Sequence, residues 1–183
     1  MEVLQQVFRL EDKMKKEFRI EYAYAYGIEH VAENWKKYPH EPIPYIEVAD
    51  ANIYFYINEN LLKNPKWLAS TTDWILYYCL GLSQAVLELK EKKTAKVSGG
   101  DNPLDIEFKM EGVNIVHIKF LHVFLKEEKI SYKGFAEGVL ELLDKFLKDV
   151  DSINPELYKI DAFKKIKENR EKIRQILKKL NEK

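Results

Sequence analysis

Cysteine is nearly absent from this 183-residue sequence, in which Cys79 is the only one. A single thiol cannot form an internal disulfide, and it cannot supply a zinc cluster. Cys79 lies in the apolar run 74–80, where a cysteine is typically buried and inert. The sequence therefore predicts no disulfide framework and no cysteine-based catalysis.

Long apolar runs and a leader segment are also missing. The run 74–80 is the longest, and it is far shorter than the ~20 residues needed to cross a bilayer. A signal peptide has a basic stretch followed by an apolar one, and residues 1–6 show no such pattern. Together with the lone cysteine, these absences predict a cytoplasmic protein with no membrane partner.

Neither charge sign is in excess, because 30 Lys and Arg residues balance 30 Asp and Glu residues. This balance argues against a protein that coats nucleic acid or an anionic membrane, so a nucleic-acid partner is not expected. The charge is unevenly distributed, however. Residues 161–183 hold nine basic and four acidic residues, a net of +5, and residues 1–160 therefore carry −5.

Catalytic and metal-binding patterns are absent as well. There is no Gly-x-Ser-x-Gly nucleophile motif. The four histidines are His30, His40, His117 and His122. Their spacings do not converge on a metal ion, since positions 117 and 122 would face opposite sides of a regular strand. We therefore expect no catalytic residues, no metal and no cofactor, and we favour a non-enzymatic role.

Aromatic residues, by contrast, are abundant, with 11 Tyr, 9 Phe and 3 Trp in a sequence that is 46% hydrophobic. Such rings bury a large area each, so the chain is rich enough for a compact core. Its length fits one domain over residues 1–183. Within it we expect an N-terminal helical segment (1–38), a sheet with a central helix (45–132) and C-terminal helices (133–183).

Several segments alternate apolar and polar residues in the period of a strand. The clearest are 105–110 and 116–120, which predict a hairpin whose second strand ends near 121–122. Segments 45–49 and 53–57 predict a second hairpin with a turn at 50–52, and 94–98 predicts a short strand. Residues 19–26 fit both periods, and we slightly favour one long helix bent near Gly27.

Helical patterns cover much of the remainder. Residues 74–89 are apolar on nearly every side, which predicts a buried central helix that starts at Asn64-Pro65 or near Ser70 and Asp73. Residues 135–150 predict an amphipathic helix, Asn154 caps a short turn, and Asp161 caps the last helix. The expected fold is α+β: a mostly antiparallel sheet of about 4–6 strands packed on a buried central helix, with further amphipathic helices at the N-terminus and C-terminus.

The outward positions of the expected strands form the first candidate binding surface. Tyr54 and Tyr56 share one strand face, and Lys109, His117 and Lys119 project away from the apolar faces of the hairpin. Tyrosine is enriched at protein interfaces because it offers a large rigid area with a polar tip. If all these strands form one sheet with helices on one side only, the other side is a Tyr/His/charged binding surface.

Two further segments are alternative sites. The loop containing Gly99, Gly100, Asp101 and Asp105 is a candidate ligand loop, because backbone N–H groups cradle anions and carboxylates bind cations. In the last helix, positions 166, 173 and 180 and positions 163, 170 and 177 follow a heptad spacing. This spacing allows a homo-oligomer through residues 161–183.

These observations lead to a functional hypothesis with two alternatives. The leading one is a non-enzymatic protein-binding module of a bacterial cytoplasm, such as an immunity (toxin-neutralising) or inhibitor-type protein, with another protein as its partner. The first alternative is a small-molecule sensor or enzyme with a pocket near residues 98–105. The second is a structural protein that self-associates through its C-terminal helix.

Overall fold

The computed structural model describes residues 16–37, 50–63, 71–100, 104–122 and 124–182. Their strands form two four-stranded antiparallel sheets. Sheet A contains β1 (Phe18–Tyr24), β2 (Asp50–Ile57), β3 (Asn60–Leu61) and β4 (Thr71–Trp74), and both β3 and β4 pair with β2. Sheet B has the order β5 (Thr94–Ser98), β6 (Asp105–Glu111), β7 (Ile115–Phe120) and β8 (Lys126–Ser131). The predicted α+β class and its antiparallel pairing are confirmed, with the strands divided between two sheets.

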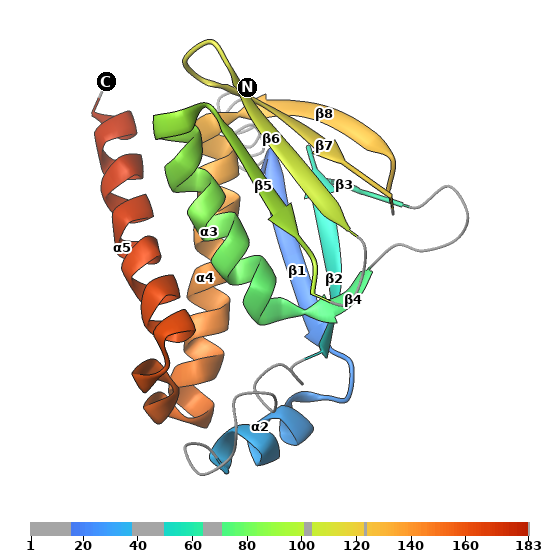
Figure 1. The fold of residues 1–183 in the computed structure, drawn as a ribbon, viewed down its shortest axis with the longest axis vertical. Coiled ribbons are helices and arrows are strands. Elements are labelled where there is room, and N and C mark those ends of the chain that lie inside the picture. Colours follow the sequence, from blue (N-terminus) through green and yellow to red (C-terminus); the bar gives the residue numbers. More distant parts are fainter. Residues whose placement is uncertain (1–15, 38–49, 64–70, 101–103, 123, 183) are drawn as a thin grey trace, which may run out of the picture.

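The described helices lie beside these sheets or, in the case of the first one, at one end of the molecule (Figure 1). They are α2 (Ile28–Lys36), α3 (Ile75–Lys92), α4 (Tyr132–Ile153) and α5 (Asp161–Asn181), with a short 3-10 helix η2 (Pro155–Lys159) between the last two. In Figure 1, α3 and α4 lie between the strands and α5. The outermost helix, α5, therefore packs on α3 and α4 and not on a sheet.

Both sheets direct their buried side chains into one core. Phe55 of β2 meets Phe120 of β7 with ring centroids 5.4 Å apart. Phe135 of α4 contacts Phe18 of β1 and Phe108 of β6, at 5.2 and 4.9 Å. Helix α3 has nine buried residues, and most of its other residues are half-buried, so the predicted burial of this helix is confirmed for about half of its circumference. The sheets and the two central helices therefore share a single hydrophobic cluster.

Residues 18–24 form a strand, so the slight preference for a helix there is wrong. The register pairs Phe18 with Ile57 and Tyr24 with Ala51 along the whole of β2. Phe18, Ile20 and Tyr22 are consequently buried, whereas the intervening side chains are half-buried or exposed. A strand is favoured over a helix in this segment because pairing with β2 forms the backbone hydrogen bonds and also buries the alternating apolar face.

Strand β2 starts at Asp50, so the predicted turn at 50–52 is also wrong. Ala51 pairs with Tyr24 on one side and with Asp73 on the other, and this two-sided pairing extends the strand. The strand expected at 45–49 lies outside the described residues. Strand β8 was not predicted, because Lys126–Ser131 is mostly charged and buries only Ile130. Within the described part of the chain this strand pairs with β7 alone.

The helix ends differ in part from the predicted ones. Helix α3 begins at Ile75, and Asp73 belongs to β4, while Ser70 and Asn64-Pro65 lie outside the described residues. Asp161 is the first residue of α5, which has no side-chain cap. The hydroxyl of Ser131 accepts a hydrogen bond from the Gly134 N–H and caps α4. Asn154 caps η2 as predicted.

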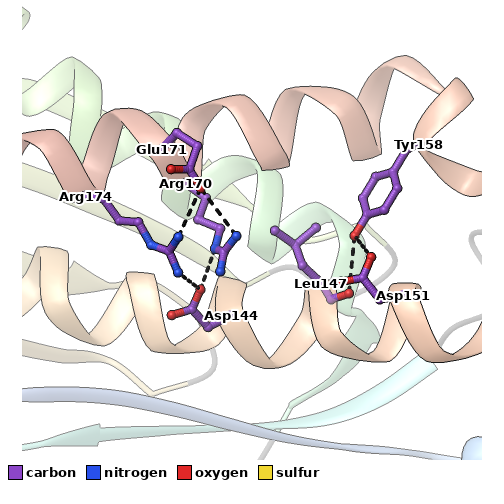
Figure 2. A network of polar contacts seen from close by, with 7 residues as sticks. All are labelled: Asp144, Leu147, Asp151, Tyr158, Arg170, Glu171 and Arg174. Carbon is purple, nitrogen blue, oxygen red and sulfur yellow. Dashed lines mark hydrogen bonds and ion pairs between the residues drawn. The ribbon is translucent and has the colours of Figure 1, made fainter. Parts of the chain in front are cut away.

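Polar contacts join α5 and η2 to α4 (Figure 2). Arg170 and Arg174 of α5 both contact the Asp144 carboxylate of α4, the latter at 3.1 Å. The Tyr158 hydroxyl donates to Asp151 at 2.8 Å and to the Leu147 carbonyl at 3.3 Å. The apolar stripe of α5 is buried against α3 and α4 at Phe163, Ile166, Ile173 and Leu177. That stripe is covered within the chain, so we do not propose self-association through it.

Candidate functional site

The outward face of sheet B is a regular charged surface among the described residues. In β6 and β7, alternate side chains point to the core, and Glu107, Lys109, His117 and Lys119 point away from it. The cross-strand register sets Lys109 opposite His117 and Glu107 opposite Lys119. The alternation of the predicted hairpin therefore placed these residues on one face correctly, and β7 ends at Phe120 as expected.

Ion pairs cross this face from strand to strand. Lys119 contacts Glu127 at 3.1 Å, and Lys129 contacts Glu111 at 2.7 Å. These hydrogen bonds hold the pKa of Glu127 and that of Glu111 below their usual values. His117 lies between the two glutamates, 3.3 Å from Glu127 and 3.7 Å from Glu111.

A depression of about 600 Å³ opens beside strand β5. It is lined by Glu88, Lys92, Thr94, Ala95, Lys96, Glu107, Phe108, Lys109, His117 and Lys119. Four lysines and two glutamates give this lining a net charge of +2, with the histidine neutral. Lys92 contacts Glu88 at 2.9 Å, whereas Lys109 has no ion pair within the described part of the chain. Three of the five predicted binding residues, Lys109, His117 and Lys119, meet here.

The two predicted tyrosines lie elsewhere, on sheet A. The Arg19 guanidinium stacks 3.8 Å from the centre of the Tyr56 ring, and the Tyr56 hydroxyl donates to Glu21 at 3.1 Å. Tyr54 stands opposite Glu21 in the register. The combined Tyr/His/charged surface required a single sheet, and that condition is not met. Tyr54 and Tyr56 are half-buried on a surface of their own.

The candidate ligand loop is occupied by the chain itself where the structure describes it. The Gly100 N–H donates to both oxygens of Asp73, at 3.1 and 3.0 Å, and the Gly99 N–H donates to the Leu104 carbonyl. Asp73 is 1% exposed. Asp105 forms an ion pair with Lys96 at 2.8 Å, and this contact lowers its pKa. Asp101 lies outside the described residues. The Gly100 N–H therefore binds a carboxylate of the chain itself.

Other reactive groups do not assemble into a second site in the described residues. Burial raises the pKa of the Cys79 thiol well above its usual value, which keeps it protonated at neutral pH. No group of three or more His, Cys, Asp or Glu side chains is arranged to hold a metal ion in the described part. Nor does any helix there combine the length and the apolar character that a membrane span needs.

Sequence reasoning missed the α3 and β5 contributions to the depression. Lys96 and Thr94 share the outward face of β5 with Ser98, and the alternation of the predicted strand 94–98 is the signal that would have found them. Glu88 and Lys92 reach the depression only because α3 packs against β5. No local sequence pattern indicated the role of Asp73, because its partner Gly100 is 27 residues away.

Comparisons with known proteins do not assign this site. No family model matches the chain, and searches of curated proteins and of solved structures return no significant match. A functional assignment therefore has to come from the chemistry of the residues themselves.

Proposed function

We propose that this chain is a non-enzymatic protein-binding module that binds its partner through the outward face of sheet B. The observation that carries the proposal is the meeting of Lys109, His117 and Lys119 in one cationic depression on an exposed strand face. Exposed, alternating charges of this kind steer association and select partners of complementary charge. The finer proposal is an inhibitor-type or toxin-neutralising protein of a bacterial cytoplasm.

Two features favour a macromolecular partner over a small-molecule substrate. The depression is open to solvent, whereas small-molecule sites are typically clefts that enclose most of the ligand. The ion pairs of this face also extend beyond the depression to Glu111, Glu127 and Lys129. The charged area is therefore wider than a small ligand. We therefore expect binding without turnover.

The test is capture of the partner from a lysate of the source organism with tagged protein. We expect the wild type to retain one stoichiometric protein and the double variant Lys109→Glu, Lys119→Glu to lose it, by about tenfold or more in affinity. Lys164→Glu, Lys178→Glu is the matched control, because both lysines are exposed on α5 and lie outside the depression. Circular dichroism checks that each variant is folded.

Three results would contradict the proposal. Equal capture by the wild type and by the Lys109/Lys119 variant removes sheet B as the interface. Loss of capture in a Tyr54→Ala, Tyr56→Ala variant alone moves the interface to sheet A. Failure of the wild type to retain any protein removes the binding-module assignment itself.

A further inference from the structure

The hydrogen-bond register determines which backbone groups of β5 face away from sheet B. The Met110 N–H donates to the Lys93 carbonyl at 2.8 Å, and the Gly99 N–H donates to the Leu104 carbonyl at 3.0 Å. In an antiparallel pair, hydrogen-bonded positions alternate with positions whose N–H and C=O point outward. Positions 93, 95, 97 and 99 therefore bond to β6, and Thr94, Lys96 and Ser98 direct their N–H and C=O groups to the opposite edge.

This edge of β5 is unpaired in the described part of the molecule. Strand β5 pairs with β6 alone, and no described residue forms a hydrogen bond with the backbone of Thr94, Lys96 or Ser98. The three side chains are exposed. An edge with free donors and acceptors is a template for one more strand, and adding an extended peptide to such an edge is a recurrent mode of recognition.

Part of the edge borders on open space. The depression of about 600 Å³ is lined by Glu88 and Lys92 of α3, by Thr94, Ala95 and Lys96 of β5, and by residues of β6 and β7. The depression therefore borders Thr94 and Lys96 of the edge, and both α3 and the outward face of the sheet contribute to its lining.

The charges around the edge select the added strand. The lining carries a net +2, and Lys96 stands at the middle of the edge. A second copy of β5, paired antiparallel about Lys96, would bring two lysines face to face, which is unfavourable. An acidic strand would instead bring carboxylates to Lys109, which has no ion pair among the described residues, and to Lys96, which is paired there with Asp105 at 2.8 Å. A single-stranded nucleic acid is disfavoured, since Phe108 of the lining is 2% exposed and the other ring there, His117, lies between Glu111 and Glu127.

We propose that the partner of this module contributes an extended segment with acidic side chains, which pairs with the free edge of β5 as a fifth strand of sheet B. This inference rests on the proposed function and names the mode of binding at the same face. The backbone of Thr94, Lys96 and Ser98 forms the new ladder, and the lysines of the depression select acidic side chains at alternate positions.

Residue-resolved hydrogen exchange by NMR tests the free edge directly. In the unbound protein we expect the amides of Thr94, Lys96 and Ser98 to exchange much faster than those of Ala95 and Val97, which bond to β6. Comparable protection at all five positions would mean that the edge is already covered, and it would overturn the proposal.

Two blocked hexapeptides test the added strand, one alternating Val with Glu and one alternating Val with Lys. At millimolar concentration we expect the Glu peptide to slow exchange at Thr94, Lys96 and Ser98 by about tenfold and the Lys peptide to leave it unchanged. Lys96→Pro removes the outward N–H, and Lys96→Gln removes only the charge. Proline is tolerated at an edge position of this kind, and we expect it to abolish the protection that the glutamine variant retains in part.

The outcomes separate this inference from the proposed function. If the captured partner or the Glu peptide perturbs Lys109 and Lys119 but leaves exchange at the β5 amides unchanged, the binding face stands and the added strand is wrong. The added acidic strand is also wrong if an RNA oligonucleotide slows exchange at the β5 amides to the same extent as the Glu peptide. If the Glu peptide protects the edge but the Lys109→Glu, Lys119→Glu variant captures the partner normally, the face of Lys109 and Lys119 is removed as the interface of the proposed function, whereas the free edge of β5 stands.

Discussion

At the scale of single residues, a buried polar pair joins α5 to α3. Asn169 and Ser83 are both 0% exposed, and the Asn169 amide donates to the Ser83 hydroxyl at 3.0 Å. The hydroxyl in turn donates to the Leu80 carbonyl at 2.8 Å. The Asn169 carbonyl oxygen has no partner among the described residues. A buried polar atom without a hydrogen bond destabilises the native state, so this pair is a poor source of stability.

Substitutions on the two sides of this pair should therefore have opposite effects. We expect Ser83→Ala to lower the free energy of unfolding by about 1–3 kcal/mol, because it leaves the Asn169 amide unpaired. We expect Asn169→Leu to be neutral or to raise it by about 1 kcal/mol, because Ser83 keeps its bond to Leu80. Urea unfolding measures both. A large loss of stability in Asn169→Leu would show that the amide has an essential partner.

At the scale of secondary-structure elements, α4 approaches β1 closely at Gly138. A methyl group added at Gly138 would overlap the carbonyl oxygen and carbon of Phe18. The approach is reinforced on the same helix face, where the Lys145 ammonium donates to the Tyr22 carbonyl at 2.8 Å. The Tyr22 hydroxyl donates to Asp149 at 2.5 Å. Glycine at 138 therefore lets the helix backbone lie directly on the strand.

Gly138→Ala should reverse the usual effect of this substitution in a helix. Alanine normally stabilises a helix by about 1 kcal/mol relative to glycine. Here we expect a loss of about 2–3 kcal/mol or more, because α4 must move away from β1. Thermal and urea unfolding measure the difference. The exposed position Glu137 is the control: its Ala variant should be more stable than its Gly variant. A stabilised Gly138→Ala protein would show that the two elements are not in contact.

At the scale of the whole molecule, buried tyrosines couple stability to alkaline pH. Burial raises the pKa of Tyr22, Tyr78 and Tyr132 above the ordinary value of 10.0, in the last case to about 12. Above pH 10 the unfolded chain loses phenol protons that the folded chain retains. The unfolded state then binds fewer protons, so the free energy of unfolding falls as pH rises.

Below about pH 9 we expect the free energy of unfolding to be independent of these tyrosines. Above pH 10 we expect it to decline by up to about 1.4 kcal/mol per pH unit for each buried tyrosine. Tyr132→Phe should cost about 1 kcal/mol at neutral pH, because it loses the bond to the Val86 carbonyl, and it should make the alkaline decline shallower. Urea unfolding at a series of pH values measures both. A decline of equal steepness in the variant would remove Tyr132 as a cause.

How far the sequence predicted this molecule depends on the range of each interaction. The hairpin of β6 and β7 was predicted, together with the common face of Lys109, His117 and Lys119, because alternation and a short turn are local. Strand β1 was not predicted, since Phe18 pairs with Ile57 across a distant part of the chain. Strand β8 was missed because an edge strand buries too little to show a pattern.

The sequence by itself determined the α+β composition, the buried helix α3, the amphipathic helices α4 and α5, and the outward set of charges on β6 and β7, because helix and strand periodicities are properties of neighbouring residues. Only the tertiary structure decided that the strands divide into two sheets, that Tyr54 and Tyr56 lie apart from Lys109, and that α3 joins β5 to form the cationic depression. These outcomes depend on which distant strands satisfy each other's backbone groups and share a core. No pattern among neighbouring residues specifies which distant strands pair.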